Sequence, residues 1–137
     1  MNIKSLILTT IVAFIAVWAT DFLIHAVWLG ETYGATKELW RPEEQMMPMM
    51  PWMFAGQFVI GAVFVWIFAS FVAEKRSLGK SLQFGLAMGT FSAGAQLIMY
   101  VVQPYPGDLV AKWVGAYLVQ GLVIGLIVHL VYKPASR

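Results

Sequence analysis

Four long apolar segments account for most of this sequence. They cover about residues 5–29, 53–73, 81–102 and 109–132, and each reaches the roughly 20 residues that a helix needs to cross the ~30 Å core of a bilayer. None shows the alternation of apolar and polar residues over about ten positions that is typical of a membrane-spanning strand. Because lipid offers the backbone no hydrogen bonds, the sequence predicts an all-α integral membrane protein whose four transmembrane helices form a bundle.

The composition excludes several other classes of protein. Hydrophobic residues make up 60% and charged residues 12% of the 137 positions, against about 45–50% and 25% in ordinary globular proteins. So few charges cannot cover a folded domain in water, and we expect no nucleic-acid partner. The absence of cysteine excludes disulfides, thiolate metal sites and cysteine nucleophiles. We expect residues 1–137 to form a single membrane domain whose surroundings are the lipid bilayer.

The basic residues predict how the chain crosses the membrane. Residues 74–80 carry three basic side chains and one acidic one, whereas residues 30–52, the first loop, carry two basic and four acidic ones. Lys4, Lys133 and Arg137 lie near the chain ends, on the same side as residues 74–80. By the positive-inside rule both termini are cytoplasmic and the first loop is outside. We expect a bacterial inner-membrane protein whose first span is retained, because its apolar stretch is longer than that of a signal peptide.

Polar residues inside the predicted spans indicate a candidate site, because ionisable groups are costly at the bilayer centre. Asp21 and His25 lie four residues apart and therefore on one helix face. With a rise of about 1.5 Å per residue, Asp21 and Gln96 both lie roughly 6 Å from the middle of their spans toward the outside. The candidate ligand-binding residues, which come from all four spans and fall between the membrane centre and its outer face, are Asp21, His25, Gln57, Gln96, Tyr100 and Gln120. We interpret them as a polar cavity that opens outward.

Several functions remain open for this cavity. Its side chains could serve only to fix helix packing, as polar contacts do in membrane proteins. They could instead bind a ligand, which would make the protein a binding, transport-accessory or complex subunit and is our leading hypothesis. The alternative of a membrane enzyme for a lipophilic substrate would use His25 as acid and base, oriented by Asp21. A metal site would need a further ligand such as Glu31. The sequence identifies no cofactor and no catalytic residue.

The first loop is expected to form a short interfacial helix over residues 41–47 that caps the cavity. Proline suits the first turn of this helix and two glutamates complement its dipole, and Pro48 and Pro51 are expected to end it. The loop also contains a methionine cluster: Met46, Met47, Met49 and Met50. Thioethers are ligands for Cu(I), so copper handling is a further alternative. The other interpretation is that these methionines are flexible apolar packing residues.

Small residues at four-residue spacing predict close helix packing in the third and fourth spans. Gly85 and Gly89 form one such pair, and Gly121 and Gly125 form the other. Such spacing lets helix backbones approach closely, either within one chain or between chains of a homo-oligomer or larger membrane complex. His129 lies near the cytoplasmic end of the fourth span, far from His25, and is expected to be an interfacial side chain.

Overall fold

The computed structural model describes residues 1–135, and this part of the chain is helical, with no strand. Within it, four helices are long and apolar enough to cross a membrane. The predicted all-α class with four candidate spans is therefore confirmed. They are α1 (Ile3–Asp21) continued by the π-helix η1 (Phe22–Trp28), α4 (Met50–Ile67) continued by the π-helix η4 (Phe68–Val72), α5 (Leu78–Val102) and α6 (Gly107–Val131). These bounds lie within three residues of the predicted ranges. Arg137 lies outside the described residues.

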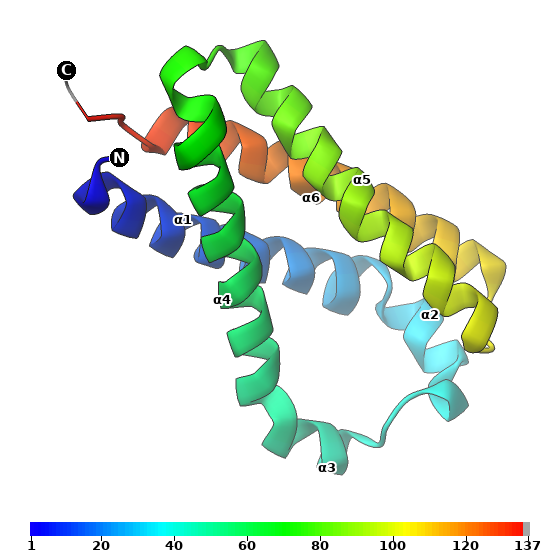
Figure 1. The fold of residues 1–137 in the computed structure, drawn as a ribbon. Coiled ribbons are helices and arrows are strands. Elements are labelled where there is room, and N and C mark those ends of the chain that lie inside the picture. The colour runs from blue at the N-terminus through cyan, green and yellow to red at the C-terminus, as the bar shows by residue number, and fades with distance from the viewer. Residues whose placement is uncertain (136–137) are drawn as a thin grey trace.

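Helices α1, α5 and α6 run along one another, and α4 crosses α1 steeply (Figure 1). Helices α5 and α6 are antiparallel neighbours, and α1 packs against both α6 and α4. At the crossing of α1 and α4, a Cβ atom on Gly61 would lie 3.3 Å from the backbone nitrogen of Phe14, so the small residue permits the approach. The N-terminal part of α4 therefore diverges from α1 toward the first loop, while the described chain ends lie together at the opposite end.

The four glycines singled out in the sequence lie in the contact between α5 and α6 of the same chain. A Cβ atom on Gly89 would lie 2.5 Å from the carbonyl oxygen of Tyr117, and one on Gly125 would lie 2.7 Å from that of Ser81. Real Cβ atoms do not approach a carbonyl so closely, so only glycine permits this distance between the helices. The structure thus shows the intrachain packing, and a second copy of the chain would need another surface.

Two apolar clusters lie at opposite ends of this arrangement. The cluster toward the chain ends is formed by Ala13, Val17, Phe64, Val65, Phe68, Ala73, Ile124, Val128 and Tyr132. The other, toward the first loop, is formed by Leu29, Leu109, Val110 and Trp113, with Tyr33, Trp40 and Tyr105 packed against it. Asp21 of α1 and Gln120 of α6 lie along their helices between residues of the two clusters.

The first loop contains α2 (Gly30–Ala35), η2 (Lys37–Leu39), α3 (Glu43–Met46) and η3 (Met47–Met49). Helix α3 follows Pro42 as expected, but Pro48 and Pro51 do not end the helical path. Each proline instead occupies the first turn of the next helix, η3 or α4, where its missing N–H would have no helical partner anyway. Tyr33 of α2 and Trp40, which directly follows η2, pack against the second cluster.

Candidate functional site

Asp21 ends α1 and accepts hydrogen bonds from two other helices. Gln57 of α4 donates from Nε2 to Oδ2 at 2.7 Å, and Gln120 of α6 donates from Nε2 to Oδ1 at 2.8 Å. The Gln120 amide also donates to the hydroxyl of Thr20 at 2.8 Å. Both glutamines are buried, with 6% and 8% of their surface exposed. Three of the six predicted residues therefore meet in one network, and Thr20 joins them.

The side-chain oxygen of Gln57 is buried and has no hydrogen-bond partner in residues 1–135. The amide cannot simply turn over to find one, because its NH2 group must face the Asp21 carboxylate. A buried acceptor without a partner costs about 1–3 kcal/mol. The network therefore contains an acceptor that no described protein group satisfies.

The charge of Asp21 is likewise not neutralised by an ion pair in the described part of the chain. The ion pair found there joins Lys112 and Asp108, four residues apart on the surface of α6. Both donors to Asp21 are neutral amides. A carboxylate at this depth in an apolar protein is costly unless a hydrogen-bonding or charged partner compensates it.

His25 lies in η1, which begins directly after Asp21. The wider turn of this π-helix is visible in the bond from the Leu29 N–H to the Ile24 carbonyl, five residues earlier, at 2.9 Å. Such turns are often found at functional sites. No hydrogen bond or ion pair joins His25 to Asp21 within residues 1–135, although both side chains line the same pocket.

The partner of His25 is Tyr33 of α2. The His25 Nδ1 atom and the Tyr33 hydroxyl are 2.6 Å apart, and Trp113 donates from Nε1 to the same hydroxyl at 2.8 Å. Burial raises the pKa of Tyr33, and the hydrogen bond from Trp113 opposes this with a smaller effect. Tyr33 therefore connects the first loop to η1 and to α6 through hydrogen bonds. The orienting group of the histidine is this tyrosine rather than the carboxylate.

Gln96 and Tyr100 of α5 do not join Asp21. Gln96 donates to the hydroxyl of Tyr117 at 3.2 Å. Tyr117, Asp21 and Gln120 line a cavity of about 10 Å³, which is room for one water molecule at most. Tyr100 is 46% exposed. Depth along the membrane was the only basis for grouping these two residues with Asp21, and depth contains no information on the rotation of α5.

A pocket of about 560 Å³ opens between α1, η1 and the N-terminal part of α4, and we call it the α1–α4 pocket. Its polar lining consists of Asp21, His25 and Gln57. The rest of the wall is apolar and contains Trp18, Phe22, Met50, Met53 and Phe54. Small-molecule sites in proteins have this character, with mostly apolar walls, a few converging polar groups and volumes of about 300–1,000 Å³.

His25 also lines a second pocket, of about 710 Å³, which we call the first-loop pocket. Tyr33 and Trp40 contribute to its wall, together with Lys37 and Arg41. His25 therefore lines both pockets: the α1–α4 pocket contains one carboxylate, and the first-loop pocket contains Lys37, Arg41 and Glu43.

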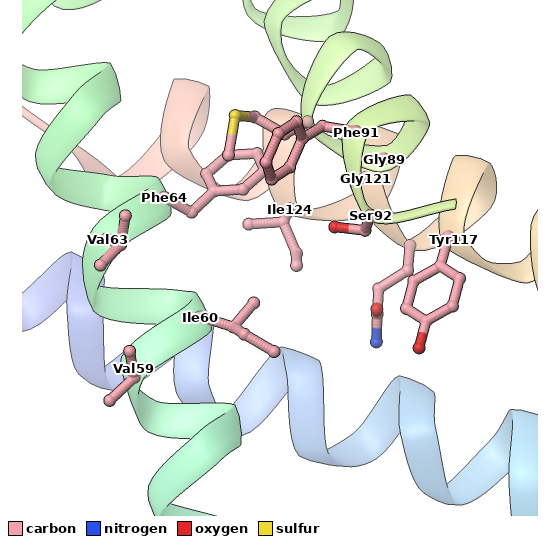
Figure 2. A pocket seen from close by; sticks show the side chains of 12 residues that line it. Val59, Ile60, Val63, Phe64, Gly89, Phe91, Ser92, Tyr117, Gly121 and Ile124 are labelled. Carbon is pink, nitrogen blue, oxygen red and sulfur yellow. The ribbon is translucent and has the colours of Figure 1, made fainter. Parts of the chain in front are cut away.

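Figure 2 shows a third pocket, of about 240 Å³, between α4, α5 and α6. Its labelled side chains are mainly apolar, among them Ile60, Phe64 and Ile124, and Ser92 and Tyr117 add hydroxyl groups. The pocket reaches Gln120 but not Asp21. The α1–α4 pocket is therefore a stronger candidate site than this third pocket, because it is larger and its lining includes the Asp21 carboxylate.

The methionine cluster lies on the surface of the first loop. Met46 and Met47 are 43% and 61% exposed. Arg41 donates from a guanidinium nitrogen to the sulfur of Met49 at 2.8 Å, which places a positive charge where a copper ion would also have to bind. Met50 lines the α1–α4 pocket. Among residues 1–135, no three His, Asp or Glu side chains are grouped so that they could hold a metal ion.

His129 has a structural partner that the sequence did not reveal. Its Nδ1 atom lies 3.1 Å from the hydroxyl of Ser81, so the pair joins α6 to α5 beside Gly125. Tyr33 was missed as the partner of His25, and Trp113 as the partner of Tyr33, although both are aromatic residues typical of the membrane interface. No pattern in the sequence links residues eight and 80 positions apart in this way.

Comparisons with known proteins give no relative for this chain: no family model, no curated protein and no solved structure matches it.

Proposed function

We propose that this chain is a small membrane binding protein, of the bacterial inner membrane, that holds an amphipathic molecule in the α1–α4 pocket. The observation that carries the proposal is the Asp21 carboxylate, which has no ion-pair partner in residues 1–135, in the lining of a 560 Å³ pocket with mostly apolar walls. Each oxygen of this carboxylate accepts one hydrogen bond from a glutamine and keeps the capacity for another, which a ligand in the pocket would use. The positive-inside rule then places the pocket in the outer half of the membrane.

The contacts favour binding over catalysis. An enzyme with a His/Asp pair would require Asp21 to orient His25, but the hydrogen-bond partner of His25 Nδ1 is the Tyr33 hydroxyl. Copper handling is disfavoured by the Arg41 guanidinium at Met49. A binding protein of this size would act as a transport accessory or as a subunit of a larger membrane complex.

Photocrosslinking at two neighbouring positions of η1 tests this proposal. Ala26 lines the α1–α4 pocket, whereas Val27 is 64% exposed and lines none of the pockets described above. Each is replaced by p-benzoylphenylalanine, the cells are irradiated, and the purified protein is analysed by intact mass spectrometry. We expect a discrete small-molecule adduct at position 26 and bulk phospholipid adducts at position 27. The proposal is wrong if position 26 yields only the adducts seen at position 27.

A further inference from the structure

The polar groups of the α1–α4 pocket also indicate the chemical class of its ligand. We infer that the pocket takes a protonated lipophilic amine: a cation with N–H donors on an apolar body. This inference rests on the proposed function, because it concerns the occupant of the same pocket.

The first argument is charge. Asp21 carries the negative charge of the pocket wall, and no cationic side chain pairs with it in residues 1–135. Lys37 and Arg41 line the first-loop pocket instead. A carboxylate kept away from water is strongly stabilised by a cation placed against it, whereas an anionic ligand would be repelled.

The second argument is hydrogen bonding. Each oxygen of Asp21 accepts one bond from a glutamine and retains the capacity for another. Both glutamine NH2 groups face the carboxylate, so the positions left open at Asp21 are acceptor positions and the complementary ligand is a donor. His25 Nε2 does not distinguish between a donor and an acceptor on the ligand, because its own role depends on the tautomer.

The third argument is the wall around these acceptors. Trp18 and Phe22 stack with their ring centroids 6.2 Å apart, and Phe54 faces the same pocket from α4. Aromatic faces attract ammonium groups when water is excluded. Met50 and Met53 complete an apolar surface that adapts to the body of the ligand. An alkylamine with an apolar body supplies the positive charge, the N–H donors and the apolar surface that these three arguments require.

Rhodamine 6G tests the inference, because it is a fluorescent lipophilic cation with two N–H groups. Binding is measured by fluorescence anisotropy with the full chain in lipid nanodiscs. The variant Asp21→Asn removes the charge, and the amide of Gln57 can then turn its oxygen toward the new NH2 group, so the helices stay connected. We expect affinity for rhodamine 6G to fall at least about tenfold in Asp21→Asn, and to be unchanged in the matched control Asp108→Asn at the surface.

Equal affinity of wild type and Asp21→Asn would overturn the inference. If Asp21→Asn does not fold, Gln57→Leu replaces it: this variant loses the hydrogen bond that holds the Asp21 carboxylate in place, and we expect several-fold weaker binding, so unchanged binding would again overturn the inference. Tetramethylrhodamine methyl ester, a cation without N–H groups, should bind more weakly than rhodamine 6G to wild type, and equal binding would contradict the donor requirement.

Nile red, a neutral amphiphile, separates this inference from the proposed function. If wild type binds Nile red at the α1–α4 pocket but not rhodamine 6G, the amine is wrong and a binding function stands. If it binds neither, both are wrong.

Discussion

Gln57 donates a hydrogen bond to the carboxylate of Asp21 at 2.7 Å and so joins α4 to α1 on the first-loop side of their crossing at Gly61. On the other side of the carboxylate, Gln120 makes the matching bond from α6. One acidic side chain thus connects three of the four long helices.

The two glutamines are expected to differ in their contribution to stability. Gln120→Leu removes bonds to Asp21 and Thr20 and should lower the free energy of unfolding by about 2 kcal/mol. Gln57→Leu removes one bond and, with it, the buried unsatisfied oxygen, so the loss should be about 1 kcal/mol. Equilibrium unfolding in mixed detergent micelles measures both. A larger loss in Gln57→Leu than in Gln120→Leu would contradict the assigned contacts.

Tyr33 should make the stability of the protein depend on alkaline pH. Burial raises its pKa above the ordinary value of about 10, so the folded state favours the neutral phenol. The stabilisation is full below the ordinary value and is lost as the pH rises through the raised pKa. We expect wild type to be more stable than Tyr33→Phe by about 1–2 kcal/mol at pH 8, and this difference to shrink by pH 11. A difference that stays constant in thermal unfolding over this range would contradict the assigned burial.

Glycines of α5 and α6 provide a test of the close packing with internal controls. Gly89→Ala and Gly125→Ala place a Cβ atom against a backbone carbonyl and should destabilise the protein by about 1–3 kcal/mol. Gly94→Ala and Gly115→Ala lie on the same two helices with nothing within 4 Å of the added atom. These controls should be neutral or slightly stabilising, because alanine favours the helix. Four similar results in thermal unfolding would refute the observed helix contact.

The absence of cysteine from the sequence makes the predicted orientation easy to test. Gly34 in α2 and Gly79 at the start of α5 both have open space around an added side chain. In intact spheroplasts, a membrane-impermeant maleimide should label Gly34→Cys at once and Gly79→Cys only after lysis. The reverse pattern would show that the positive-inside rule fails for this chain.

The methionine cluster should prove dispensable for metal binding. We expect the quadruple change of Met46, Met47, Met49 and Met50 to Leu to leave the copper content of Cu(I)-treated protein unchanged, because Arg41 already occupies the Met49 sulfur. Elemental analysis after gel filtration measures this content. Loss of one equivalent of copper relative to wild type would revive the copper alternative.

The sequence alone determined the helical membrane class and the approximate helix bounds. It also identified Asp21 as an acidic residue within an apolar span. These follow from the length of each apolar segment and from the free energy of placing a charge in lipid, and both quantities depend on one helix at a time. The glycine spacing likewise predicted a close helix contact, since it is a property of each helix surface.

The tertiary structure decided which polar residues meet. Gln57 and Gln120 reach Asp21, whereas Gln96 binds Tyr117 and His25 binds Tyr33. These pairings depend on the steep crossing of α4, on the rotation of each helix about its axis and on the π-helical turn after Asp21. Such variables are set by contacts between helices distant in sequence, so no periodicity within one span contains them. For this reason the sequence indicated Asp21 and a polar cavity around it, but not which of the six candidate residues line the α1–α4 pocket.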